Sequence, residues 1–377
     1  MDALHIALVT ETYPPEINGV AMTLGRLVDG LRARGQRVSL TRPRQSQDGA
    51  AGIDEDEHLV IGLPIPGYAG LNLGLASKRR LSAAWRKSRP DIVHIATEGP
   101  LGWTAIAVAR SLQIPVVAGF HTNFHNYSRY YGLGWLQRPF SAYLRQFHNR
   151  AQLTLAPTRK LVEQLGAEGY RNLGVMTRGV DTVVFHPQRR DPALREFWGI
   201  GQNDVALIYV GRLAAEKNLS LLVNTFRAIQ TVQPQSRLVL VGNGPKFHKM
   251  QREHPDFIFS GPRIGEDLAR HYASADLFLF PSLTETFGNV LLEAMASGLA
   301  SVAFDYAAAS EHLQHGVNGM KATYGDEADF MRLAAALATN REATRRLGRA
   351  ACLTTQGLAW GSVLDQLLED YRQLLAR

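Results

Sequence analysis

The amino-acid sequence predicts two α/β domains, each a doubly wound parallel sheet covered by helices. The chain has 377 residues, of which 45% are hydrophobic and 20% charged, which is enough for two cores of ordinary size. Short apolar runs typical of buried strands alternate with helical patterns. This pattern restarts at residues 205–212 (VALIYVGR) after a turn-rich stretch. We therefore expect domains at residues 1–187 and 188–357, followed by an amphipathic helix within residues 358–377.

Composition excludes several classes of protein. The sequence has no apolar run near the roughly 18 residues that a membrane-spanning helix needs. Its opening run (LHIALVT, residues 4–10) is a short strand pattern that passes into polar sequence, unlike a signal peptide. We therefore expect a cytoplasmic protein. The single cysteine, Cys352, excludes an internal disulfide framework and a cysteine-based metal cluster.

The net charge of +7 belongs to the first half of the chain. Residues 1–187 contain 21 Lys and Arg against 14 Asp and Glu, whereas the remainder contains 20 of each. An excess of positive charge in one half can bind nucleic acid, can bind anionic lipid, or can only increase solubility. The six basic residues within residues 78–89 form either a solvated helix face or a surface that rests on anionic lipid.

Eight aromatic rings and four arginines are interleaved at residues 124–150. Three interpretations are open for this segment. It can be a lipid or acceptor surface, a surface that stacks nucleic-acid bases, or the core face of a helix. The core interpretation uses residues spaced by three or four, namely Phe140, Tyr143, Leu144 and Phe147.

Three segments of the first domain place candidate residues after strands, at the sheet edge where such folds bind ligands. The strand at residues 4–10 leads to a loop with Gly19 and then a helix, an arrangement that faces phosphate. Gly19 either lets backbone approach a substrate or is an ordinary turn glycine. Two further strands end just before Glu98, and just before His121 and Asn123. Glu98 and Asn123 are candidates for facing an acceptor. His121 either contacts a substrate at this edge or is a loop histidine bonded to backbone.

The second domain carries two cations between a strand end and a helix start. Arg212 and Lys217 lie in GRLAAEKNL, where they can either be surface charges or grip one diphosphate. A guanidinium makes a two-pronged bond to phosphate oxygens, whereas an ammonium is a compact point charge.

The strand at residues 276–281 is followed by a loop with Glu285 and by a helix that Gly288 opens. The free backbone N–H groups at that helix start attract phosphate, and the helix ends near Gly298. Glu293 lies five residues into the helix, about 7.5 Å along it at 1.5 Å per residue. The two glutamates can therefore flank a diphosphate, as a nucleotide sugar requires, or simply be solvated.

The pair Glu285 and Glu293 in ETFGNVLLEAMASG resembles the paired-glutamate motif of the retaining glycosyltransferases of family 4, which have the GT-B fold. VTETYPPEINGV, HTNF and GRLAAEKN occur in the family's order, so the resemblance covers nearly the whole chain. Where the family commonly has two adjacent glycines, this sequence has Asn18 and Gly19. The resemblance implies two Rossmann-like domains facing a cleft, with the terminal helix crossing back to the first domain. It also implies transfer of a sugar from a nucleoside diphosphate to a hydroxyl with retention.

The resemblance assigns roles residue by residue. Glu285 would hold the sugar, and the loop around Arg263 would hold the nucleobase. The implied catalytic residues are Glu285, Arg212, Lys217 and His121. The implied donor-binding residues are Gly19, Arg263, Glu293 and the backbone of Phe287, Gly288, Asn289 and Val290, and the implied acceptor residues are Glu98 and Asn123. No cofactor and no metal are expected, since no Asp-x-Asp pair stands in a metal-ligand setting.

The stretch PRIGEDLARHYASADLFLFPS is similar to that of bacterial GDP-mannose-dependent mannosyltransferases acting on glycolipids. This favours mannose as the transferred sugar and a lipid or glycolipid acceptor, reached by peripheral attachment of the basic half to an anionic membrane surface. A UDP-glucose-dependent enzyme with a lipid or soluble carbohydrate acceptor is the alternative. A nucleic-acid-binding protein is the rival from another class, but it leaves the phosphate-facing features of the neutral half without a purpose.

Overall fold

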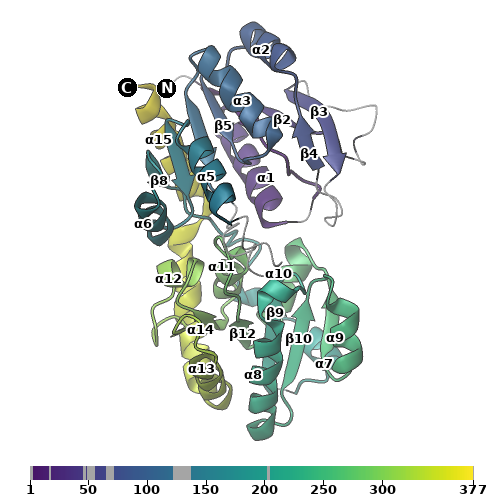
Figure 1. Cartoon of the computed structure of the whole chain (residues 1–377). Helices are drawn as coiled ribbons and strands as arrows, with labels where there is room; N and C mark the ends of the chain where they lie inside the picture. The colour runs from purple at the N-terminus through teal and green to yellow at the C-terminus, as the bar shows by residue number, and fades with distance from the viewer. Residues whose placement is uncertain are drawn as a thin grey trace. The chain divides into compact units, whose positions relative to one another are not determined.

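The computed structural model describes residues 3–16, 18–45, 48, 56–64, 72–121, 137–201 and 204–376. Contacts divide the chain into two compact units (Figure 1). Unit 1 holds the described residues up to Arg178 together with those from Trp360 onward, and unit 2 holds Gly179–Ala359. The change of unit precedes the expected position at 187/188 because Val180 and Phe185 already pack into the core of unit 2.

Unit 1 contains an eight-stranded sheet with the order β4-β3-β2-β1-β5-β6-β7-β8. Its strands are β1 (His5–Val9), β2 (Arg37–Pro43), β3 (Glu57–Pro64), β4 (Asn72–Leu75), β5 (Ile92–Ile95), β6 (Val116–Gly119), β7 (Leu153–Ala156) and β8 (Leu173–Val175). All neighbours are parallel except β3 and β4. The order reverses at β1, which places the carboxyl ends of β1 and β5 at the edge where doubly wound sheets bind ligands.

Helices cover both faces of this sheet. They are α1 (Gly19–Arg32), α2 (Lys78–Lys87), α3 (Pro100–Ser111), α5 (Gln137–His148), α6 (Arg159–Ala167) and α15 (Trp360–Leu375). One core lies under α1 and α15, and another lies under α2 and α3. The side chain of Asn18 starts α1 by accepting hydrogen bonds from the backbone of Val20 and Ala21, as N-cap residues do.

The C-terminal helix α15, yellow in Figure 1, packs on unit 1. Leu364 fills the space beside Gly30, where a Cβ would lie 2.2 Å from the leucine Cδ1. The buried hydroxyl of Tyr371 lies 2.6 Å from Nδ1 of His94 on β5. The expected return of the terminal helix to the first domain is therefore confirmed.

Unit 2 contains a six-stranded, entirely parallel sheet with the order β11-β10-β9-β12-β13-β14. Its strands are β9 (Ala206–Val210), β10 (Arg237–Val241), β11 (Ile258–Gly261), β12 (Leu277–Phe280), β13 (Ala300–Phe304) and β14 (Met320–Ala322). Its helices are α7 (Pro192–Phe197), α8 (Leu219–Val232), α9 (Phe247–Glu253), α10 (Gly265–Ser274), α11 (Asn289–Ala296), α12 (Ala308–His312), α13 (Glu327–Thr339) and α14 (Arg341–Thr355), with 3-10 turns η2 (Pro187–Arg189), η3 (Ala215–Lys217) and η4 (Gln356–Leu358).

The structure adds strands that the sequence analysis did not find. One of them is β14, which pairs with β13 from Val302↔Met320 onward and extends the sheet by one strand. The antiparallel pair β3 and β4 was also missed. These strands are short or half-exposed, so none of them shows the apolar run that marks a buried strand.

In its described part, the structure decides one of two open interpretations of the basic half, because an exposed basic face on α2 fits both a solvated helix and a lipid surface. In α5, Leu144 and Phe147 are buried, which supports the core interpretation for residues 137–148. In α2, Leu81 and Trp85 are buried while the basic side chains face solvent. Among the helices of the described residues, none has the length and apolar character that crossing a bilayer requires.

Candidate active site

In unit 2, the structure brings Lys217 and Glu285 into contact. Lys217 ends the 3-10 turn after β9, and Glu285 lies in the loop after β12, and β9 and β12 are neighbours in the sheet. The Nζ of Lys217 donates to Oε1 of Glu285 at 2.5 Å, and both side chains are mostly buried. The hydroxyl of Thr284 donates to the backbone carbonyl of Glu216 at 3.1 Å and ties the two loops together.

Arg212 stands at the same sheet edge. Its Nη1 lies 3.5 Å from Oε1 of the buried Glu216, and 41% of its side chain is exposed. The backbone before it is tightly packed, because a Cβ on Gly242 would lie 2.1 Å from the carbonyl oxygen of Gly211. The guanidinium is therefore anchored at one end and open to solvent at the other, as a group that binds an incoming anion must be.

Helix α11 begins at this edge with Gly288 as its N-cap. The φ of Gly288 is +92°, and an added Cβ would lie 2.9 Å from the ring of Phe280. Both facts require glycine here. The positive end of the helix dipole, at Asn289 and Val290, therefore lies beside the loop that carries Glu285. The side chain of Phe287 is buried in the core, so only its backbone can serve a ligand.

The second glutamate of the pair has a different partner. Glu293 accepts a hydrogen bond through Oε2 from the hydroxyl of the buried Tyr272 at 3.1 Å. Burial, together with the charge of Glu293, raises the pKa of Tyr272 well above its ordinary value. Tyr272 is thus a permanent donor that orients one oxygen of Glu293, while Lys217 orients Glu285.

Arg263 also follows a strand of this sheet, the outer strand β11. Its Nε donates to the carbonyl of Ser260 at 2.9 Å, and its Nη1 donates to Asp267 at 3.0 Å. These bonds hold the arginine over the start of α10, with 40% of its side chain exposed. Since the carboxyl ends of parallel strands share an edge, Arg263 belongs to the same edge as Arg212 and Glu285.

In unit 1, His121 follows β6 and is 5% exposed. Its Nδ1 accepts a hydrogen bond from Nη2 of Arg178. Burial, and then the charge of Arg178, lower the pKa of His121 well below its ordinary value, so the ring is neutral. The ring lies over Gly119, where an added Cβ would be 2.3 Å from Nε2.

The remaining candidates of unit 1 differ in their surroundings. Gly19 is the first residue of α1, and a Cβ there would meet no atom within 4 Å. Glu98 is 9% exposed, and its Oε1 lies 3.3 Å from Nε2 of His148. Asn123 lies outside the described residues.

The sequence analysis assigned no role to Arg178, Glu216 or Tyr272. Arg178 and Tyr272 orient predicted site residues, and Glu216 anchors Arg212. Arg178 lies shortly after the end of β8, in MTRGV, but nothing in the local sequence showed that its side chain is buried. Within the described residues, no cluster of three His, Cys, Asp or Glu side chains is arranged to hold a metal ion.

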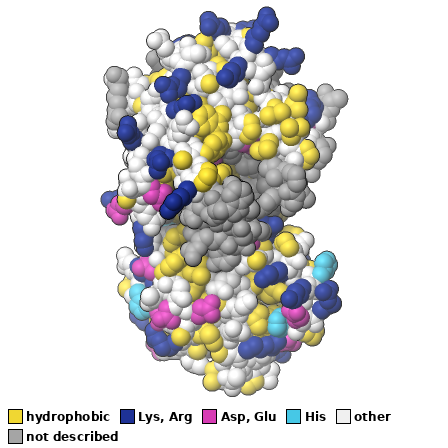
Figure 2. Space-filling view, viewed as in Figure 1, with side chains coloured by type: hydrophobic (Ala, Val, Ile, Leu, Met, Phe, Trp, Pro, Cys, Tyr) yellow, Lys and Arg dark blue, Asp and Glu magenta, His cyan; other side chains and the backbone are white. Residues whose placement is uncertain are grey.

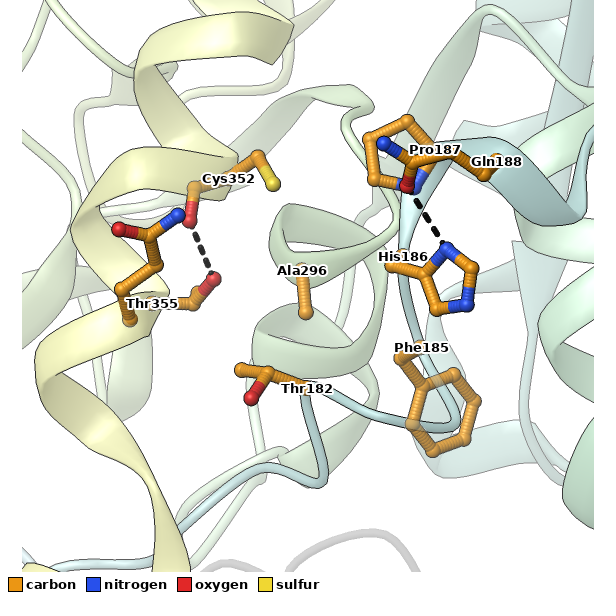
Figure 3. Close-up of a pocket in the computed structure, with 9 residues that line it drawn as sticks. Thr182, Phe185, His186, Pro187, Gln188, Ala296, Cys352 and Thr355 are labelled. Carbon is orange, nitrogen blue, oxygen red and sulfur yellow. Dashed lines mark hydrogen bonds between the residues drawn. The ribbon is translucent and has the colours of Figure 1, made fainter.

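A pocket of about 260 Å³ opens elsewhere in unit 2 (Figure 3). It lies between the segment at residues 182–188, the end of α11 and the end of α14. Its lining residues are Thr182, Phe185, His186, Pro187, Gln188, Ala296, Cys352, Thr355 and Gln356. None of the predicted site residues lines it, so it is separate from the Lys217 and Glu285 edge.

The two parallel-sheet units, each with polar residues at its carboxyl edge, define a GT-B architecture. A family model described as Glycosyltransferase Family 4 matches residues 17–184, and one described as Glycosyl transferases group 1 matches residues 204–340. The chain belongs to this glycosyltransferase family, as the sequence motifs predicted.

Three known proteins illustrate the likeness. The chain is 33% identical over 379 residues to a GDP-mannose-dependent alpha-mannosyltransferase of Mycolicibacterium smegmatis, with 99% of this chain and 98% of that protein covered. It is 28% identical over 321 residues to alpha-monoglucosyldiacylglycerol synthase of Acholeplasma laidlawii, covering 78% and 79%. Its fold is similar to that of sucrose-phosphate synthase from Thermosynechococcus elongatus, with a TM-score of 0.78, 18% identity and 99% of each chain covered. The predicted GT-B fold is confirmed.

Proposed function

We propose that the protein transfers mannose from GDP-mannose to a hydroxyl of a lipid or glycolipid acceptor, with retention and without a metal ion. The observation that carries this proposal is the contact of Lys217 with Glu285 beside the start of α11. It places a cation, a carboxylate and a helix N-terminus together, which is the set that a sugar diphosphate needs. The name of the Mycolicibacterium smegmatis relative supports mannose and GDP.

The chemistry follows from the charges. The bond from the anomeric carbon to the diphosphate breaks, so negative charge develops on the departing oxygen. Arg212, Lys217 and the start of α11 stabilise that charge without reorganising, as preorganised dipoles and cations do. A departing phosphate oxygen accepts the proton of the acceptor hydroxyl while that hydroxyl oxygen bonds to the same face of the sugar.

The carboxylates have positioning roles in this scheme. Without donor, Glu285 holds Lys217 at 2.5 Å. When donor binds, its phosphate accepts hydrogen bonds from the ammonium of Lys217. Glu285 is then available to accept a hydrogen bond from a sugar hydroxyl. Tyr272 orients Glu293 for a hydroxyl on the nucleotide side, and Arg263 with its backbone contacts the base. His121 of unit 1 contacts the transferred sugar, as the family resemblance implies.

A lipid acceptor is supported by the surface of unit 1. The basic residues of α2 face solvent, and the large apolar side chains Ile61, Leu63 and Leu75 on β3 and β4 are 68%, 48% and 42% exposed. Figure 2 shows yellow side chains over β3 and β4 and dark blue ones over α2. Exposed apolar groups beside cations are what an anionic bilayer surface binds. We therefore place the enzyme on the cytoplasmic face of a membrane.

A UDP-glucose donor is the second candidate, because a relative is named alpha-monoglucosyldiacylglycerol synthase. The test is a donor screen with the purified protein, in which GDP-mannose, GDP-glucose, UDP-glucose and UDP-galactose are each mixed with diacylglycerol-based glycolipid vesicles. Nucleoside diphosphate release and the anomeric configuration of the product are measured with and without EDTA. We expect α-mannosylated lipid from GDP-mannose, unaffected by EDTA. Product from UDP-glucose alone would replace the mannose assignment, and loss of activity in EDTA would contradict metal independence.

A further inference from the structure

The connection between β14 and α13, at residues 323–326, reaches the loop of unit 2 that carries Glu285. Strand β14 is an edge strand of the sheet and is separated from β12 by β13. Tyr324 lies just after its carboxyl end, and the Tyr324 hydroxyl donates a hydrogen bond of 3.0 Å to the backbone carbonyl of Leu283. Leu283 lies in the loop after β12, two residues before Glu285. A side chain from the edge strand therefore holds the backbone beside the candidate catalytic carboxylate.

Aromatic packing fixes the direction of the Tyr324 side chain. The centroid of its ring lies 5.2 Å from that of Tyr306 and 6.4 Å from that of Phe304. Phe304 is buried and ends β13, the strand between β12 and β14. The ring of Tyr324 therefore lies against the end of β13 while its hydroxyl contacts the loop after β12. Because Tyr324 is 50% exposed, its contribution to the hydrophobic core is small.

The next two residues of the loop are held from the other side, by the turn η3. The hydroxyl of Thr284 donates to the backbone carbonyl of Glu216 at 3.1 Å. Glu285 accepts a hydrogen bond from Nζ of Lys217 at 2.5 Å. Three consecutive residues of the loop are thus fixed by three separate hydrogen bonds. One comes from the β14 side of the sheet, through Tyr324, and two come from the β9 side.

The start of α13 also contacts the segment that carries Lys217. Nδ2 of Asn218, the residue after Lys217, donates to Oε1 of Glu327 at 3.4 Å. Asn218 precedes α8, which packs beside α13. The backbone N–H of Thr323 donates to the carboxylate of Asp329 at 2.9 Å, which fixes the connection itself to α13. The connection and the start of α13 together therefore brace both loops of the candidate site.

We propose that Tyr324 is a positioning residue of the glycosyl-transfer site, which holds the backbone at Leu283 so that Glu285 reaches the transferred sugar. This inference rests on the proposed function, in which the donor phosphate draws Lys217 away from Glu285. The lysine then no longer holds the loop, and only the hydrogen bonds of Tyr324 and Thr284 remain. A displacement of about 1 Å at a reacting centre can lower a rate by up to roughly 100-fold.

The hydrogen bond of Tyr324 should therefore matter more in the donor complex than in the free protein. Tyr324→Phe keeps the ring and removes only the hydroxyl. In the free protein the loop keeps its two hydrogen bonds to η3. The melting temperature of this variant should therefore fall by no more than about 2–4 °C, which corresponds to one hydrogen bond.

The test is a double-mutant cycle in the full-length protein, with Tyr324→Phe, Glu285→Ala and the double variant compared with the unaltered enzyme. The affinities for GDP-mannose and for GDP are measured by titration calorimetry, or those for UDP-glucose and UDP if the donor screen selects that nucleotide. Turnover is measured on the same glycolipid vesicles as in that screen. The matched control is Thr339→Val, which removes a hydroxyl that donates to the backbone carbonyl of Ala335 at 2.9 Å, at the far end of α13.

We expect Tyr324→Phe to weaken binding of the nucleotide sugar by about fivefold, the equivalent of one hydrogen bond. Affinity for the nucleoside diphosphate should be unchanged, since Glu285 contacts only the sugar, and kcat should fall by about tenfold. The control should match the unaltered enzyme. Equal losses for the nucleotide sugar and the diphosphate would indicate a general distortion of the site and would overturn the positioning role.

The double variant shows whether Tyr324 acts through Glu285. In the Glu285→Ala background, Tyr324→Phe should change the affinity for the nucleotide sugar by less than about twofold, because coupled residues are not additive. The same fivefold loss in both backgrounds would contradict the proposal. This comparison uses binding, so it holds even where Glu285→Ala abolishes turnover. An unaltered protein that binds neither nucleotide sugar would instead refute the proposed function, and the role of Tyr324 with it.

Discussion

The candidate sites of the two units compensate their cations in opposite ways. In unit 2, Lys217 contacts Glu285 and Arg212 contacts Glu216, so each cation has a carboxylate beside it before any substrate arrives. In unit 1, the buried Arg178 donates a hydrogen bond to the neutral ring of His121, and no carboxylate of the described residues forms an ion pair with it. The comparison shows that an anion in unit 2 must compete with a carboxylate for each cation, whereas in unit 1 the charge of Arg178 acts on neighbouring imidazoles and lowers their pKa.

The largest effect should come from the cations of unit 2. Lys217→Ala should lower kcat/KM by roughly 100-fold, which corresponds to about 3 kcal/mol of transition-state stabilisation. Steady-state rates with GDP-mannose measure this. Lys249→Ala, which removes an exposed lysine of α9, is the control and should leave the rate unchanged. An active Lys217→Ala enzyme would remove the basis for a diphosphate site in unit 2.

The buried imidazoles of unit 1 predict a pH effect on stability. Burial and the charge of Arg178 lower the pKa of His94 to about 4, whereas an unfolded histidine titrates near 6.5. Between pH 6.5 and 4, His94 is therefore protonated in the unfolded chain but stays neutral in the folded chain. The free energy of unfolding falls as the pH drops through this range. The loss is about 3 kcal/mol, to order of magnitude.

Urea denaturation across this pH range measures that loss. His94→Gln should flatten the slope, while His58→Gln, which changes an exposed histidine of β3, should not. An unchanged slope in His94→Gln would show that other groups govern the acid sensitivity.

Glycine at position 119 should matter because His121 occupies the space that a side chain would take. Gly119→Ala puts a Cβ 2.3 Å from Nε2, so the ring must move, at a cost of about 1–3 kcal/mol in stability. Activity should fall with it. Gly166→Ala in α6 is the matched control, since its Cβ would meet the nearest atom at 3.8 Å, and it should gain up to about 1 kcal/mol. Equal behaviour of the two variants would contradict the packing of His121 over β6.

The smallest effect concerns the orientation of Glu293. Tyr272→Phe removes the hydrogen bond of 3.1 Å to that carboxylate and should weaken donor binding by about 1 kcal/mol, roughly fivefold. Tyr170→Phe is the control, because this buried hydroxyl of unit 1 has no hydrogen-bond partner among the described residues. Donor titration by fluorescence measures both, and similar affinities would show that Tyr272 does not position Glu293.

The candidate site residues of unit 2 could be chosen from the sequence because each follows a strand with a clear local pattern. Arg212 and Lys217 follow a strong apolar strand, and Glu285 and Gly288 follow another. Parallel strands end at one edge, so the local pattern already implies that these residues gather there. The contact of Lys217 with Glu285 follows from β9 and β12 being neighbours.

The missed elements lack that local signal. Strands β4 and β14 have four and three residues. Such short segments form strands because they pair with a neighbouring strand, and their own composition contributes little. The unit boundary was placed late for a similar reason. Val180 and Phe185 look like an extension of the first domain in sequence, but their burial assigns them to unit 2.

The sequence by itself determined the class of fold, the family and most of the candidate residues, because hydrophobic periodicity and strand-end motifs are local properties of the chain. Only the tertiary structure decided which charges are compensated. Whether an arginine is exposed or buried, and whether an acid stands beside it, depends on packing among segments distant in sequence, as Arg178, His121 and His94 show. Burial sets the free energy of a charged side chain, and the local sequence MTRGV does not show that the side chain of Arg178 is buried.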